Sequence, residues 1–201
     1  MLPARVKDYA ASWLDDLCTA GRTLWTRLRP LASGTQGGGR SSLRATPILL
    51  LPRRAVPTWS RLACAAADDE ALGGRAQRVF DFLEANGASF FDEIADGARL
   101  LRAEVEDALA ELVVRGRANC DSYAGLRALL VPAARRATAA ARSRRRVALF
   151  GIEDAGRWST IRAPQAAPDG KLGAEALEHV AHILLRRYGV VCFPLDRKSV
   201  V

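Results

Sequence analysis

The sequence predicts an α+β fold, mainly α, in which small helical modules carry short β-ribbons. Hydrophobic residues make up 49% of the 201-residue chain and charged residues 26%, which is typical of globular domains. Aromatic residues make up only 6%, so the cores must be built largely from Ala, Leu and Val. Apolar residues recur at helical spacing in several windows, and short apolar runs bounded by turn residues follow these windows.

The first 53 residues predict one helix and a two-stranded ribbon. Apolar residues at helical spacing indicate a helix that ends at Gly21, and apolar runs at 22–30 and 43–52 flank a Gly-rich loop. A helix followed by a ribbon is the back half of a winged helix. We therefore predict a partial winged helix over residues 1–53, followed by a linker with one short helix over residues 54–74.

Residues 75–131 contain every element of a winged helix in the expected order. A helix ends at Asn86-Gly87, a short strand is predicted around Phe90, two further helices follow, and two strands are predicted on either side of Ser122–Gly125. The third helix carries apolar residues that are predicted to lie on its buried side: Leu101, Val105, Leu109, Leu112 and Val113.

The remainder of the chain predicts a linker and the start of another module. Residues 132–146 are rich in arginine and form the linker, and residues 147–201 begin a further, truncated β/α module. The sequence Gly-Arg-Trp-Ser, which ends at Ser159, is predicted to begin the first strand of this module. Its helix is expected to bury four residues: Leu177, Val180, Ala181 and Leu184.

The net charge of +8 is unevenly distributed, because residues 75–131 sum to −3 and residues 132–201 sum to +7. Six arginines lie between positions 134 and 146 without any acidic residue, so they could contact a phosphate backbone or simply form a solvated linker. A tryptophan beside the next arginine could stack on a base or lie in a core. The predicted nucleic-acid-binding residues are Arg135, Arg136, Arg142, Arg144, Arg145, Arg146, Arg157 and Trp158.

The third helix of the middle module occupies the place at which many winged helices read the major groove. Its predicted outward residues are Glu106, Asp107 and Glu111, and residues 102–115 sum to −2. Because carboxylates repel phosphates, we expect this helix to provide scaffold or protein contacts instead.

No pattern of catalytic residues is recognisable, and no phosphate-binding loop, dinucleotide fingerprint or nucleophile elbow occurs. His179 and His182 have metal-compatible spacing but share a polar stripe with Glu175, which favours a solvated face. The four cysteines lie far apart, which indicates reduced thiols. We therefore predict no catalytic, metal or cofactor site. The absence of a signal sequence or membrane-spanning segment predicts a cytoplasmic location.

Several motifs in the same order resemble the region downstream of the motor in the Lhr (large helicase-related) family. The similar stretches are RATPILLLPRR, GASFFDEIADGARLLRAEVEDALAELVVRGRANCDSYAGLRALL, GRWS and LLRRYGVV, and together they span roughly residues 5–192. The resemblance implies a parent protein with two motor domains that hydrolyse ATP with Mg²⁺, translocate on single-stranded DNA and act in DNA repair. It also implies tandem winged helices beyond the motor.

We therefore expect a non-catalytic winged-helix fragment of an Lhr-type helicase that gives scaffold and auxiliary nucleic-acid contacts. Its expected partners are a DNA or RNA:DNA backbone, the parent's motor domains and a second copy of the chain, without a membrane. Because the ATPase motifs have no counterpart here, we expect the chain alone to be inactive as an ATPase. The alternatives are a free-standing winged-helix DNA-binding regulator and an enzyme of the winged-helix DNA glycosylase type.

Overall fold

The computed structural model describes residues 6–27, 43, 47–63, 71–131, 151–161 and 173–189. The chain divides into two units, Met1–Pro164 and Gln165–Val201, and each is described by itself. The described residues are mainly helical with short antiparallel strand pairs, which confirms the predicted α+β, mainly α fold class. None of the helices in these ranges is both long and apolar enough to cross a bilayer.

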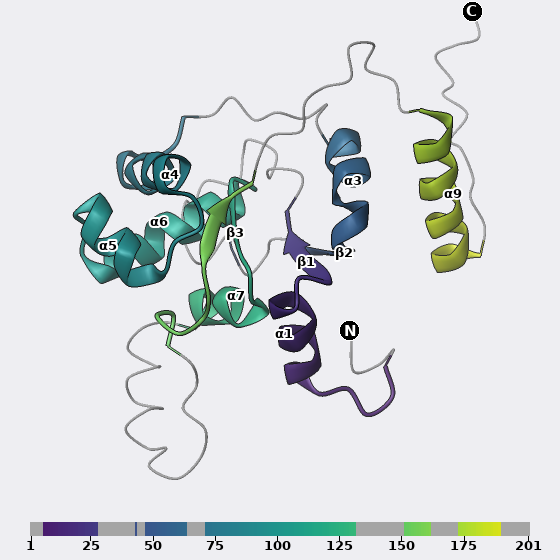
Figure 1. Cartoon of the computed structure of the whole chain (residues 1–201), viewed down its shortest axis with the longest axis horizontal. Coiled ribbons are helices and arrows are strands. Elements are labelled where there is room, and N and C mark those ends of the chain that lie inside the picture. The colour runs from purple at the N-terminus through teal and green to yellow at the C-terminus, as the bar shows by residue number, and fades with distance from the viewer. Residues whose placement is uncertain are drawn as a thin grey trace, which may run out of the picture. The chain divides into compact units, whose positions relative to one another are not determined.

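The middle of the chain folds as a winged helix (Figure 1). Its three helices are α4 (Gly74–Asn86), α5 (Phe91–Ala98) and α6 (Arg102–Val114), and their apolar faces pack into a common core. Two strands, β3 (Ala118–Cys120) and β4 (Trp158–Thr160), complete the module as an antiparallel pair.

The position of β4 contradicts the prediction that Gly-Arg-Trp-Ser begins a further module. Trp158 lies opposite Cys120 of β3, and it exchanges backbone hydrogen bonds of 2.8 and 2.9 Å with Ser89. Because the N–H and C=O of one strand residue point to the same side, β4 lies between Ser89 and β3. In Figure 1 the green β4 runs beside the teal β3. The strand after the Arg-rich segment is therefore the last strand of the middle winged helix.

The second strand predicted after Ser122 is wrong, because residues Tyr123–Leu130 form the helix α7. Ser122 is its N-cap, and the Ser122 hydroxyl accepts a hydrogen bond from the backbone N–H of Gly125 at 3.1 Å. A Cβ on Gly125 would lie 2.6 Å from the Cys120 sulfur, so the glycine lets α7 approach β3 closely. An apolar face that includes Leu126 and Leu129 then buries α7 against the core.

The N-terminal module has the predicted helix and ribbon. α1 (Ala11–Thr19) precedes the antiparallel pair β1 (Thr23–Thr26) and β2 (Leu49–Pro52). A 3₁₀ turn, η1 (Arg53–Ala55), and α3 (Val56–Ala63) follow, so the short helix expected in the linker is present.

The N-terminal module and the middle winged helix share one hydrophobic core. Trp25 of β1 is buried edge-on against Trp158, with the ring centroids 6.5 Å apart, and its indole N–H donates to the carbonyl of Ser122 at 2.7 Å. α1 packs against α7, and an ion pair joins Asp15 to Arg127. Residues 1–53 and 75–131 therefore belong to one compact unit, although the sequence predicted separate modules joined by a linker.

Replacing Gly116 by Ala is expected to lower the free energy of unfolding by at least about 1–3 kcal/mol. Gly116 has a φ of +66°, and a Cβ there would lie 2.5 Å from the backbone oxygen of Arg27. Gly74→Ala is the control, because a Cβ at Gly74 meets nothing within 4 Å and should leave stability unchanged or slightly higher. Denaturant unfolding of both variants measures the difference. Equal stabilities of the two variants would contradict the close approach of the Gly116 backbone to the Arg27 backbone.

The second unit is described only by α9 (Ala174–Tyr188). Val180 is buried as predicted, but Leu177 is exposed, so the prediction that this leucine is buried is wrong. His179 and His182 are both exposed, as expected for a solvated stripe. Among the residues that the structure describes, no group of three or more His, Cys, Asp or Glu side chains could hold a metal ion.

Candidate nucleic-acid interface

The Arg-rich segment connects two described elements of the middle module. Arg135, Arg136, Arg142, Arg144, Arg145 and Arg146 lie outside the described residues. The structure does describe both flanks of the segment, which are α7, with Leu130 as its last residue, and the stretch that leads from Gly151 into β4. Because β3 and β4 pair within one unit, the predicted tether between modules is instead an insertion between α7 and the last strand of the same module.

Arg157 lies at the root of this insertion and is held by Asp121. Its backbone N–H donates to one carboxylate oxygen of Asp121 at 2.8 Å, and its guanidinium Nε lies 3.3 Å from the other. A Cβ on Gly156 would lie 2.2 Å from Asp121, so glycine is required beside this contact. The Arg157 side chain is nevertheless 55% exposed. Since exposed ion pairs are weak, Asp121 does not prevent Arg157 from reaching a phosphate.

Trp158 is among the predicted nucleic-acid-binding residues, with stacking on a base and burial in a core as the two alternatives, and the structure places it in the core. The indole is 0% exposed and packs against Trp25 in the shared core. A base cannot reach either face of the ring while the core is intact. The alternative interpretation, a tryptophan in a core strand, is the one that the structure supports.

α6 offers little basic or accessible surface for reading a groove. Glu106 is 5% exposed, so the prediction that it faces outward is wrong, whereas Asp107 is exposed as expected. Glu111 accepts from the backbone N–H of Gly73 at 2.8 Å and is therefore engaged at the start of α4. Seven of the 13 residues of α6 are buried, and α4, α5, α7 and β3 pack against it.

The N-terminal end of α6 is also occupied. Arg102 lies 3.0 Å from Asp92 of α5 and forms a second ion pair with Glu153, which follows the Arg-rich segment. The returning chain thus contacts the end of α6 that many winged helices insert into DNA. A scaffold role for α6 is consistent with these contacts.

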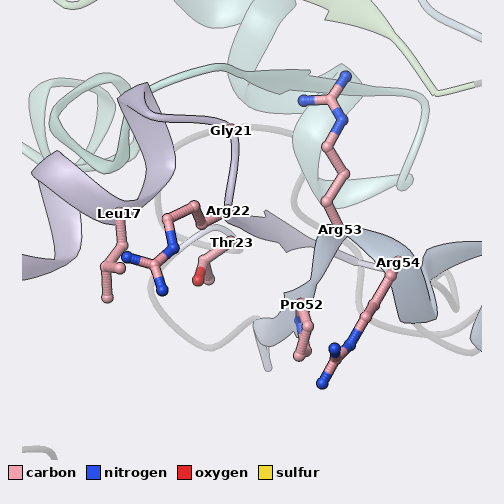
Figure 2. A pocket seen from close by; sticks show the side chains of 7 residues that line it. All are labelled: Leu17, Gly21, Arg22, Thr23, Pro52, Arg53 and Arg54. Atoms are coloured by element: carbon pink, nitrogen blue, oxygen red, sulfur yellow. The ribbon is translucent and has the colours of Figure 1, made fainter.

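Three arginines that the sequence did not indicate line one pocket of about 470 Å³: Arg22, Arg53 and Arg54 (Figure 2). Among the described residues, no ion pair involves any of these three side chains. Their proximity follows from the antiparallel register, in which Thr23 lies opposite Pro52. The residue before the first strand therefore lies beside the residues after the second. The proximity of these arginines can therefore be read from the sequence only when the pairing of the two strands is known.

The end of α1 determines where Arg22 lies. Gly21 has a φ of +67°. The N–H of Arg22 donates to the carbonyl of Leu17 at 3.0 Å, and the N–H of Gly21 donates to the carbonyl of Cys18 at 2.8 Å. This is the Schellman pattern of helix termination. The N–H of Arg53 in turn donates to the carbonyl of Arg22 at 3.0 Å. The backbone thus holds both arginines at the same end of the ribbon.

Comparisons with known proteins show which sequences this chain is similar to. Residues 1–53 match the family model of the large helicase-related protein winged-helix domain. The chain is 28% identical over 206 residues to a Mycolicibacterium smegmatis protein named Lhr helicase/probable uracil glycosylase. It is 27% identical over 211 residues to an Escherichia coli K12 protein named Lhr helicase/uracil glycosylase. Each alignment covers 95% of this chain but only 12% and 13% of the respective relative.

Proposed function

We propose that the chain belongs to the Lhr (large helicase-related) family and is a non-catalytic winged-helix part of an Lhr-type ATP-dependent helicase. In this role it provides scaffold and auxiliary nucleic-acid contacts during DNA repair. Its partners are the nucleic-acid backbone and the motor domains of the same protein. The observation that carries the proposal is the pairing of β3 with β4, which brings both flanks of the Arg-rich segment into one winged-helix module.

This placement favours binding to the phosphate backbone. The segment holds six arginines without an acidic residue between them, and both of its flanks lie in one compact unit. Arginine presents five N–H donors in a planar fork that suits phosphate oxygens. Contacts of this kind are insensitive to base sequence and are weakened by salt, because binding releases counterions. An auxiliary contact that follows a moving strand needs both properties.

The structure around α6 argues against the alternative of a free-standing regulator that reads DNA sequence. Such a protein needs a helix whose accessible side chains reach base edges. In α6, Glu106 is buried, Glu111 is engaged at Gly73, and the exposed Asp107 would repel phosphates.

Changing Arg142, Arg144, Arg145 and Arg146 together to Gln is expected to weaken binding and to flatten its salt dependence. If each arginine neutralises one phosphate, the slope of log K against log salt should fall by roughly 3 units. Fluorescence anisotropy with labelled DNA at several salt concentrations measures this slope. Asp107→Asn is the control and should not weaken binding. An unchanged slope in the arginine variant, with weaker binding in the control, would assign the contact to α6 instead.

The names of both relatives, which include uracil glycosylase, favour a second candidate, a part in uracil removal from DNA. This candidate is tested by incubating the purified chain with a uracil-containing oligonucleotide and measuring released uracil. Release above background would support catalysis by this chain. An intact oligonucleotide that is nevertheless bound would support the binding role alone.

A further inference from the structure

We infer that the exposed face of α1 and the adjoining arginine pocket form a binding surface for single-stranded nucleic acid. In this surface Arg22, Arg53 and Arg54 contact phosphates and Trp13 stacks on a base. The inference goes beyond the proposed function, because this surface is separate in sequence from the Arg-rich segment. It lies almost entirely within residues 1–53, which match the winged-helix family model.

The pocket is positively charged without local compensation. Its seven lining residues include three arginines and no carboxylate: Leu17, Gly21, Arg22, Thr23, Pro52, Arg53 and Arg54. Figure 2 shows Arg22 and Arg54 on opposite sides of the pocket, with Thr23 and Pro52 between them. Arg53 extends the other way, toward Gly21, where a Cβ would lie 3.7 Å from its guanidinium. Cations of this kind, spaced around an opening beside a hydroxyl group, can bind successive phosphates.

The carboxylate of Asp15, on the same helix, is already engaged. Asp15 forms an ion pair with Arg127 of α7, on the side of α1 that packs against the middle module. Asp15 therefore neutralises Arg127, and not one of the arginines that line the pocket. Asp16, the other carboxylate of α1, is exposed but does not line the pocket, so the three arginines remain in excess there.

An apolar stripe on α1 continues from this pocket. Leu17 lines the pocket and is partly exposed, and Trp13 lies one turn earlier on the same face, about 6 Å along the helix axis. Trp13 is 47% exposed, and the ring of Tyr9 lies edge-on to it with centroids 6.5 Å apart. A large indole that is held by a neighbouring ring yet half exposed is a suitable stacking platform.

The arginines and the exposed indole of Trp13 together indicate which ligand this surface binds. Proteins that bind single strands combine cations that follow the backbone with aromatic side chains on which bases stack. An acidic peptide would use the arginines but would gain nothing specific from an exposed indole ring. A duplex would present phosphates to the arginines but keeps its bases stacked inside. Single-stranded nucleic acid is the ligand that uses both parts of the surface.

The test compares binding of a labelled oligothymidylate and a labelled duplex of the same length by the full chain and its variants. Trp13→Ala is expected to weaken binding of the single strand about fivefold or more and to affect the duplex much less. Phe90→Ala is the matched control, because Phe90 is equally exposed at the start of α5. Arg22→Gln, Arg53→Gln and Arg54→Gln together should reduce the salt slope by roughly 2 units. Thermal unfolding confirms that every variant is folded.

The outcomes separate this inference from the proposed function. If the Arg22, Arg53 and Arg54 variant keeps its affinity and slope while the Arg-rich segment variant loses them, the α1 surface is not a nucleic-acid site. If Trp13→Ala weakens single strand and duplex equally, or no more than Phe90→Ala does, base stacking is refuted. Preferential binding of oligoglutamate or of anionic lipid vesicles at this surface would assign it to another partner and also overturn the inference.

Discussion

A chain that ends at Val131 is expected to lose its cooperative unfolding transition, whereas a chain that ends at Pro164 is expected to keep it. The shorter chain has all three helices of the middle winged helix but lacks β4. It therefore leaves Ser89 and β3 without their strand partner and removes the buried side chains of Ile152 and Trp158 from the shared core.

The size of this effect follows from the core residues alone. Removing a buried tryptophan costs about 3–5 kcal/mol and a buried isoleucine about 2–5 kcal/mol, against a total stability of about 5–15 kcal/mol for a typical domain. Circular dichroism during thermal unfolding measures both truncated chains. A sharp transition in the chain that ends at Val131, at the same temperature as the longer chain, would show that residues 75–131 fold without β4.

Replacing Leu109 by Ala is expected to lower the free energy of unfolding by about 2–5 kcal/mol. Leu109 lies in the middle of α6, which packs against α4, α5 and α7, and it is completely buried, so truncation leaves a cavity in the shared core. Chemical denaturation monitored by tryptophan fluorescence measures the loss, because Trp25 and Trp158 lie in the same core.

Leu101→Ala is the matched control for this substitution. The sequence predicted that Leu101 also lies on the buried side of α6, but it occupies the N-cap and is 73% exposed. The same chemical change there should alter stability by no more than about 0.5 kcal/mol. Comparable losses at the two positions would mean that the start of α6 has been placed incorrectly.

The helices of the middle module could be predicted because each has an apolar face at helical spacing and a clear end. Asn86 precedes a glycine, and Arg99 in the left-handed region ends α5. α7 was mistaken for a strand because Tyr123–Leu130 is a short apolar run, and periodicity alone does not distinguish strand from helix at that length. The N-cap Ser122 was the available signal.

The pairing of β4 could not be read from the sequence. Trp158–Thr160 is too short to show an alternation of buried and exposed residues. In the sequence, α7 and the Arg-rich segment separate it from its partner β3. Local patterns carry no information about a partner so distant in the chain. The same limit explains Trp158, whose burial depends on that pairing, and Glu106, whose burial depends on the elements that pack against α6.

The candidate site was predictable only in part. A run of arginines without acids is visible in the sequence, and so is the pair Arg157 and Trp158. The arginines of the α1 pocket are not contiguous, and Arg22 meets Arg53 only because two strands pair in one register. A charged surface built by strand pairing becomes visible only after the fold is known.

The place of β4 in the sheet has a consequence for synthesis of the protein. The ribosome makes the chain from the N-terminus, so α4 to α7 emerge before the strand that completes their sheet. At 5–20 residues per second, roughly 1.5–6 s separate the synthesis of Leu130 from that of Thr160. During this interval the edge of β3 is open and the place of Trp158 in the core is empty. A nascent chain in this state exposes an unpaired strand edge, which makes it a target for chaperones and for pairing with other chains.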